Sequence, residues 1–206
     1  MRSSIKKAFF CNHVFDVWEN VYEPAEDSFL FADHLRVHEG ARVLDMGTGC
    51  GLLGMLAAKK ASEVVAVDVN PHAVRCARHN AVANRLSGKM AFVQGDLFTF
   101  LKEAEVFDLI LFNAPYLPSE NSETGFWLGR AWAGGATGRQ VIDRFISQAP
   151  SHLKRTGQIF LMQSTLANVK ETQLAFARRG LSVEVAANLA LPFFEELVLL
   201  KAKHPA

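Results

Sequence analysis

The sequence predicts an α/β fold with a mostly parallel sheet. Its 206 residues suit one domain, so the expected domain spans residues 1–206. Apolar, β-branched runs alternate with helical stretches along the chain, as in parallel α/β proteins. A glycine-rich turn joins one of these runs to the helical stretch that follows it. Residues 1–22 are predicted to form an N-terminal extension or flap.

Composition excludes several classes of protein. The chain has 22 basic and 21 acidic residues, and this balance argues against binding nucleic acid mainly through phosphate contacts. No apolar run is long enough for a membrane span, and Asn12, His13 and Asp16 interrupt the one stretch that resembles a signal peptide. The 3 cysteines lie far apart, which suits a reducing, cytoplasmic location and predicts no metal site.

The first elements surround the glycine-rich turn. Pro24 suits the first turn of a helix, which is expected over residues 25–37 and is ended by Gly40. Residues 42–46 read RVLDM, a short buried strand, and residues 47–51 form the turn itself.

The middle of the chain repeats the strand and helix alternation. Residues 52–60 form an apolar helix, and residues 63–69 read EVVAVDV, which is typical of a central strand. Asn70 and Pro71 begin a helix that runs to about Asn84. Residues 89–94 form the third strand.

The last third of the chain begins with its most apolar strand. The expected elements are a strand at 106–112, helix 137–153, strand 158–163, helix 165–179 and strands 181–187 and 195–201. The final two strands close the sheet, and we expect one antiparallel edge strand among them.

Four polar side chains follow four strands. In open α/β sheets ligands bind beyond the carboxyl ends of the strands, so these side chains should meet in one cleft. They are Asp45, Asp68, Asp96 and Asn113. Residues 113–135, rich in Gly, Trp and Phe, form an unusually long loop of the kind that is often functional.

The glycine turn suggests an adenosine ligand. Gly49-x-Gly51-x-x-Gly54 matches the dinucleotide fingerprint, although a tight turn without a ligand is also possible. A pyrophosphate there would meet the like charge of Asp45, which ends the strand two residues before Gly47. S-adenosylmethionine carries a sulfonium and an ammonium group instead, so charge favours this cofactor over NAD.

The next two acidic residues suit the rest of such a ligand. Asp68 is placed to accept hydrogen bonds from ribose hydroxyls, or else to cap the helix at Pro71. Asp96 is placed to accept from the adenine amino group, or else serves as a turn carboxylate.

Asn113-Ala114-Pro115-Tyr116 suits the positioning of a planar amine. The Asn113 side-chain oxygen and the Ala114 carbonyl would each accept one hydrogen of an NH₂ group, while the Tyr116 ring would stack on its plane. The nitrogen would then face the sulfonium methyl group. The alternative is a plain Asx-Pro turn that ends a strand.

Several motifs together resemble the HemK-type release-factor glutamine methyltransferases, and most closely their short archaeal and eukaryotic branch. The blocks are VYEPAEDSFL (21–30), VLDMGTGCG, DVNPHAV, FNAPYLP and AWAGGATGRQVIDRF (131–145). The resemblance implies a single class I S-adenosylmethionine-dependent methyltransferase domain, with a Rossmann-like seven-stranded sheet, helices on both faces and a substrate loop at 113–135. It implies methylation at N5 of the glutamine in the GGQ motif of a translation termination factor, with S-adenosylhomocysteine as the other product.

The resemblance also assigns site residues. The family's cofactor contacts fall on Ser28, Asp45, Gly47, Asp68, Asp96, Leu97 and Asn113, and Gly49 belongs to the same glycine turn. The family's NPPY motif falls on residues 113–116, where Ala114 replaces the first proline. Ala114 keeps its carbonyl and precedes Pro115, which favours an extended backbone.

A small zinc-binding Trm112-like subunit is the partner that the resemblance implies. Phe9, Phe15 and Trp18 belong to an apolar N-terminal segment that would contribute to its interface or to a flap, or pack as a hairpin on the core. Three other functions stay open: methylation of adenine N6 or another exocyclic amine in DNA or RNA, methylation of protein lysine, and a non-catalytic subunit that keeps the fold.

Overall fold

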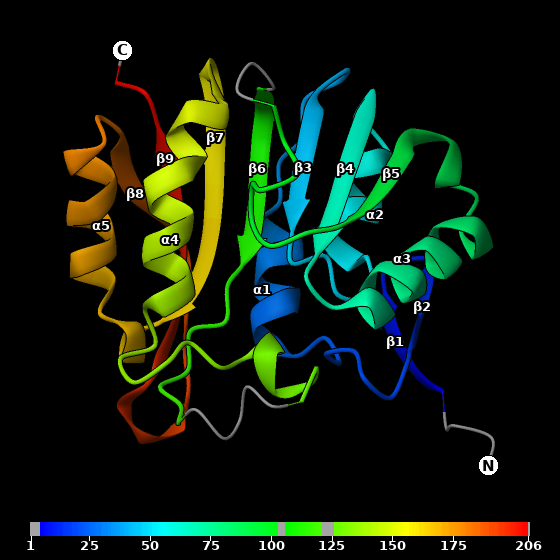
Figure 1. Cartoon of the computed structure of the whole chain (residues 1–206), viewed down its shortest axis with the longest axis horizontal. Coiled ribbons are helices and arrows are strands. Elements are labelled where there is room, and N and C mark those ends of the chain that lie inside the picture. The colour runs from blue at the N-terminus through cyan, green and yellow to red at the C-terminus, as the bar shows by residue number, and fades with distance from the viewer. Residues whose placement is uncertain (1–4, 103–105, 121–125, 206) are drawn as a thin grey trace.

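A seven-stranded sheet forms the centre of the protein (Figure 1). The computed structural model describes residues 5–102, 106–120 and 126–205. The strand order is β5-β4-β3-β6-β7-β9-β8. The strands are β3 (Arg42–Met46), β4 (Glu63–Asp68), β5 (Met90–Gln94), β6 (Phe107–Asn113), β7 (Leu153–Ser164), β8 (Ser182–Ala190) and β9 (Glu196–Lys203). The predicted α/β class is confirmed.

Helices cover both faces of the sheet because successive strand residues point to opposite sides. In β6, Leu109 and Leu111 join one core, whereas Ile110 and Phe112 join the other. The first core packs against α1 (Glu26–His34), α2 (Leu52–Ala58) and α3 (Pro71–Ala83), and the second against α4 (Gln140–Gln148) and α5 (Val169–Arg178). Burial on both sides explains why this strand reads as a continuous apolar run.

The antiparallel strand does not lie at the edge. β9 pairs antiparallel with both β7 and β8, so the edge strand β8 runs parallel to the rest of the sheet. The expectation of an antiparallel edge is therefore wrong. The chain crosses from β7 through α5 to β8 and leaves a strand position free beside β7. It then turns back after β8, and β9 occupies that position.

Two predicted helices are interrupted. Residues 137–153 hold α4 followed by a 3₁₀ turn at Ala149–His152, where Pro150 ends the α-helical hydrogen bonding. Residues 165–179 begin with a 3₁₀ turn, and α5 starts only after Asn168, which is left-handed (φ 55°) and caps the Glu171 amide. The predicted strand at 158–163 lies within the longer β7.

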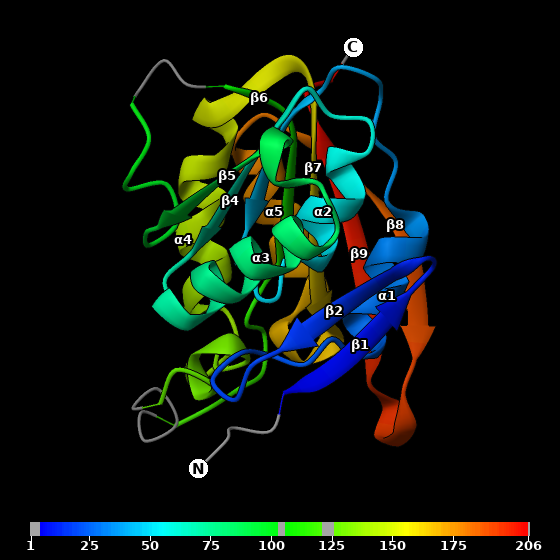
Figure 2. The same ribbon diagram turned by 90° about the vertical axis from the view of Figure 1, so that its right-hand side faces the viewer.

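The N-terminal segment forms a hairpin of β1 (Lys6–Phe10) and β2 (His13–Val17) (Figure 2). Phe15 is fully buried in the first core. Asn80 of α3 holds the hairpin, because its Oδ1 accepts from the Asp16 amide (2.9 Å) and its Nδ2 donates to the Asp16 carbonyl (2.8 Å). Of the alternatives for this segment, the structure has the packed hairpin.

The parallel strands all end at the lower edge of the sheet in Figure 1. The turn between β8 and β9 lies at this edge too, and so does the 3₁₀ turn Gly129–Ala131. Within the described residues, we find no helix with the length and apolarity needed to traverse a lipid bilayer.

Candidate active site

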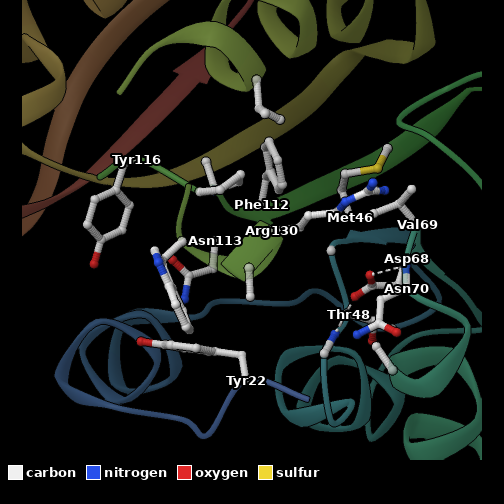
Figure 3. A pocket seen from close by; sticks show the side chains of 18 of the residues that line it. Tyr22, Met46, Thr48, Asp68, Val69, Asn70, Phe112, Asn113, Tyr116 and Arg130 are labelled. Atoms are coloured by element: carbon white, nitrogen blue, oxygen red, sulfur yellow. Dashed lines mark hydrogen bonds between the residues drawn. The ribbon is translucent and has the colours of Figure 1, made fainter. Parts of the chain in front are cut away.

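A cavity of about 560 Å³ opens at the carboxyl ends of the strands. Its size lies in the range of small-molecule sites. The structure brings all four predicted strand-end side chains to its lining: Asp45, Asp68, Asp96 and Asn113. Figure 3 shows Tyr22, Asn113 and Tyr116 on one side of this cavity and Thr48, Asp68 and Asn70 on the other.

Asp68 fixes the glycine turn. Its Oδ2 accepts from the Gly49 amide (2.9 Å) and its Oδ1 from the Asn70 amide (2.9 Å). Burial raises its pKa to about 6, although these two amides lower it. The cap of α3 is Asn70, whose side chain accepts from the His72 amide (2.9 Å), so Asp68 is not the helix cap.

Asp45 is anchored beneath the turn. Its Oδ2 accepts from the Thr48 hydroxyl (2.6 Å) and the Gly54 amide (2.9 Å). Burial raises its pKa to about 7, and the charge of Asp68 raises it further, against the two hydrogen bonds. The carboxylate lines the cavity, but it also holds the start of α2 to β3.

These contacts test which adenosine ligand fits. A pyrophosphate needs free backbone amides at the turn, but Asp68 already takes the Gly49 amide. Two buried carboxylates would also repel it. Gly49 itself has open space where a side chain would lie, so a neutral or cationic group can approach the backbone. The donor set fits S-adenosylmethionine and does not fit a dinucleotide.

Asp96 and Leu97 also line the cavity. Asp96 is half-exposed, and its Oδ2 pairs with the Arg144 guanidinium (2.6 Å). An adenine amino group would therefore use its other oxygen. Leu97 is buried and left-handed (φ 50°), which turns the chain sharply after Asp96.

A buried carboxylate, Asp27, organises the other side of the cavity. Its oxygens accept from the hydroxyls of Tyr22 (3.1 and 3.2 Å) and Tyr116 (3.2 Å). They also accept from the amide and hydroxyl of Ser28 (2.5 and 3.0 Å) and from Asn113 Nδ2 (3.0 Å). Burial raises the pKa of both tyrosines, and the charge of Asp27 raises it further.

This arrangement sets the orientation of the Asn113 amide. A carboxylate only accepts hydrogen bonds, so the Asn113 side chain must turn its NH₂ group toward Asp27. Its Oδ1 is left buried, with no hydrogen-bond partner among the described residues. Buried acceptors are nearly always satisfied, and an orphaned one in a cavity lining indicates a ligand donor.

A second segment holds residues 114–116 in place. The Ala114 amide lies 3.4 Å from the Met162 carbonyl. Leu117 then exchanges backbone hydrogen bonds with the segment after the loop, accepting from Gly134 (2.8 Å) and donating to Trp132 (2.9 Å). The AWAGGATGR block carries part of the family resemblance. In the structure, its Trp132 and Gly134 hold the backbone of Leu117. Residues 121–125 of the predicted substrate loop lie outside the described residues.

Sequence reasoning missed part of the site. Asp27 and Tyr22 stand in the block YEPAEDS, from which only Ser28 was singled out. Trp127, Arg130 and Trp132 also line the cavity, and the Arg130 guanidinium lies 4.9 Å from the Trp127 ring centre. The richness of residues 113–135 in Trp and Gly was the available signal. No cluster of metal-binding side chains occurs within the parts of the chain that the structure describes.

The fold and the site together define a class I methyltransferase: a mixed sheet with one antiparallel strand, and an acidic glycine turn that fits no phosphate. The model of the methyltransferase small domain family matches residues 22–127. A putative protein N5-glutamine methyltransferase of Methanocaldococcus jannaschii is 42% identical over 88% of this chain and 91% of its own. The chain belongs to the HemK-type glutamine methyltransferase family and is an enzyme.

Other relatives and solved structures are consistent with this family and fold. The mouse methyltransferase HEMK2 is 34% identical over 80% of this chain and 81% of its own. Among solved structures, Mtq2 from the Encephalitozoon cuniculi Mtq2–Trm112 complex has a TM-score of 0.70 and 25% identity, over 90% of this chain and 99% of its own. A Thermus thermophilus rRNA N2-guanine methyltransferase, solved with AdoMet and guanosine, shares the fold with a TM-score of 0.73 and 20% identity, over 98% of this chain and 50% of its own.

Proposed function

We propose that this enzyme transfers a methyl group from S-adenosylmethionine to the side-chain amide nitrogen of a glutamine, in the GGQ motif of a translation termination factor. The observation that carries the proposal is the buried, unpartnered Oδ1 of Asn113. An acceptor held in this way selects a substrate that presents an N–H group. The solved Mtq2–Trm112 complex is described as methylating the termination factor eRF1, which supports this choice of substrate.

The proposed cofactor contacts lie on the glycine-turn side of the cavity. S-adenosylmethionine, when bound, supplies an electrophilic methyl group on a sulfonium. Asp45 would attract its positive groups, and Asp68 would accept from the ribose hydroxyls. Gly47 and Gly49 would let it approach the backbone, with Asp96 and Leu97 beside the adenine and Ser28 and Asn113 toward the reacting end.

The proposed substrate contacts come from residues 113–116. Asn113 Oδ1 and the Ala114 carbonyl would accept the two N–H groups of the amide, while Tyr116 packs against its plane. Pro115 restricts the backbone between them. Both acceptors stabilise the positive charge that develops on nitrogen as it gains the methyl group. One N–H proton is then lost to water. Catalysis is mainly positioning, which lowers the activation free energy by roughly 7–11 kcal/mol in favourable cases.

We also propose a small Trm112-like activator subunit as the partner. The solved complex of Mtq2 with Trm112 supports this proposal. So does the structural match itself, which covers 99% of the Mtq2 chain. Exposed apolar side chains on the N-terminal hairpin, such as Phe9 and Val14, are available for such a contact.

The test is transfer of a labelled methyl group to an intact termination factor, with and without the activator. We expect labelling of the wild-type factor and none of a factor whose GGQ glutamine is replaced. Asn113→Ala should lower kcat by at least about 100-fold while S-adenosylmethionine still binds within a few-fold of its normal affinity. Calorimetry measures that binding.

Parallel reactions contain duplex DNA, single-stranded RNA or a lysine-rich protein in place of the factor. Labelling of a nucleic-acid amine or a lysine, with none of the glutamine, would overturn the proposed substrate. Unchanged kcat in Asn113→Ala would overturn the role of the amide, and binding of NAD in place of S-adenosylmethionine would overturn the cofactor.

A further inference from the structure

The turn between β8 and β9 presents two phenylalanines to solvent. Phe193 and Phe194 are both fully exposed. Both also have left-handed backbone conformations, with φ of 62° and 64°. Two successive positions of this kind in a hairpin normally hold Asn and Gly, because larger side chains are strained there. The turn therefore keeps two bulky apolar groups at a conformational cost, without burying either of them.

The base of this turn is anchored in the core that also contains Tyr116. Leu191 packs in the same apolar core as Tyr116. The amide of Leu191 donates to the Glu195 carbonyl (2.7 Å), and the amide of Glu196 donates to the Thr165 hydroxyl (3.0 Å), which fixes the base of the turn. Burial and the charge of Asp27 raise the pKa of Tyr116, and the charge of Glu195 acts in the same direction.

The turn also projects beyond the sheet, on the side where the parallel strands end. In Figures 1 and 2 the β8–β9 hairpin extends beyond the edge at which the parallel strands end. A large molecule whose glutamine entered the cavity would cover this edge. A contact at the turn would then be continuous with the contact at Tyr116.

Charge indicates the chemistry of the occupant. Glu195 and Glu196 follow the phenylalanines directly and are half-buried at the base of the turn. Two carboxylates disfavour a nucleic-acid backbone or an anionic membrane surface. A protein surface that offers an apolar side chain beside Lys or Arg matches both features.

We propose that Phe193 and Phe194 form a docking site for the protein substrate, outside the cavity. This inference rests on the proposed function, since it takes the substrate to be a whole protein. The two rings insert into an apolar patch of the substrate, and Glu195 and Glu196 face basic side chains next to that patch. The exposed aromatic pair then supplies affinity that the small cavity lacks.

The test compares steady-state methylation of the intact termination factor by wild-type enzyme and by Phe193→Asn/Phe194→Gly, with the activator present in both. The variant residues prefer the left-handed conformation, so the variant should fold at least as stably. We expect KM for the factor to rise about tenfold or more, with kcat and S-adenosylmethionine affinity unchanged. Leu174→Asn, which removes an exposed apolar side chain from α5, is the matched control and should leave KM unchanged.

Rescue and salt dependence give further readouts. Phe193→Leu/Phe194→Leu should restore most of the affinity, and Glu195→Gln/Glu196→Gln should weaken the dependence of KM on salt. Unchanged KM in the Asn/Gly variant would overturn the docking site. If wild-type enzyme labels no protein glutamine, the proposed function itself fails, and the two failures are thereby distinguished.

Discussion

At the scale of single residues, Asp27 fixes the orientation of the Asn113 amide. It receives hydrogen bonds from both tyrosines, from Ser28 and from Asn113. Because it cannot donate when ionised, it holds the Asn113 amide in one of its two orientations. We therefore regard Asp27 as a positioning residue, which acts on the substrate through Asn113.

Asp27→Asn tests this role. The new amide can donate as well as accept, so Asn113 is free to flip and present NH₂ to the substrate. We expect kcat to fall about 100-fold, because misplaced positioning groups cost that much, while S-adenosylmethionine affinity changes by less than about threefold. Single-turnover methyl transfer measures the chemical step. Tyr22→Phe removes one donor from Asp27 and leaves the other donors, so its loss should be much smaller. Equal losses in the two variants would contradict the assignment.

The two carboxylates at the glycine turn predict a pH dependence. Their pKa values of about 7 (Asp45) and about 6 (Asp68) lie above the ordinary 3.8, so the folded, ligand-free protein favours their protonated forms. The stability that this preference gives is present below about pH 4 and is lost as pH rises through about 6 to 7. A cationic ligand prefers the carboxylate forms, so its affinity should change in the opposite sense.

We expect S-adenosylmethionine affinity to rise between about pH 5.5 and 7.5 and then level off, while the unfolding free energy of the ligand-free protein falls between about pH 4 and 7. Calorimetry in buffers of different ionisation enthalpy should show protons released on binding. Adenosine, which lacks both cationic groups, should show only the smaller part due to Asp68. An affinity that does not vary with pH would contradict the proposed contacts.

At the scale of elements, the packing of α2 against β3 carries the glycine turn. α2 is only 7 residues long, and no side chain caps its start. Instead the Gly54 amide donates to Asp45 on β3. A side chain at Gly54 would place its Cβ 2.6 Å from Asp45 Oδ2, closer than atoms can approach. Position 54 is therefore glycine because helix and strand approach so closely there.

Gly54→Ala should lower the unfolding free energy by about 1–3 kcal/mol, the usual cost of overpacking. It should also weaken S-adenosylmethionine binding, because Asp45 must move. Gly88→Ala is the matched control, since a Cβ there meets nothing within 4 Å. Urea unfolding measures both variants. Equal stability of the two would show that the contact relaxes without cost.

At the scale of the whole molecule, one buried side chain connects three parts of the chain. Asn80 of α3 bonds to Asp16 of the N-terminal hairpin, and its Nδ2 also donates to the Cys50 carbonyl in the glycine turn (2.9 Å). The Asn80 amide therefore links the hairpin directly to the glycine turn. Burial of the residue means that water cannot replace these bonds.

Asn80→Ala should lower the unfolding free energy by about 2–4 kcal/mol, because the Asp16 amide and the buried Cys50 carbonyl lose this partner, whereas the Asp16 carbonyl keeps Cys76 Sγ. Hydrogen exchange should increase in both the hairpin and the glycine turn. Asn84→Ala removes an amide from the exposed end of α3, where water can substitute, and should cost less than about 1 kcal/mol. Faster exchange in the hairpin alone would show that the two segments are not coupled.

Local sequence was sufficient for the parallel strands and for the place of the site. The apolar runs of β3, β4 and β6 are buried on both faces, and their composition reports that burial directly. Asp45, Asp68 and Asn113 could be predicted to meet because parallel strands end at one edge of the sheet. Glycines and Asn-Pro marked the turns between these elements for the same local reason.

Only the tertiary structure decided the contacts between distant segments. Asp27 lies 86 residues from Asn113, and no local pattern could show that its carboxylate sets the orientation of that amide. The place of β9 between β7 and β8 depends on the α5 crossover, not on the composition of the strand. Periodicity and turn chemistry are properties of neighbours in sequence, whereas hydrogen-bond partners and strand order depend on how the whole chain packs.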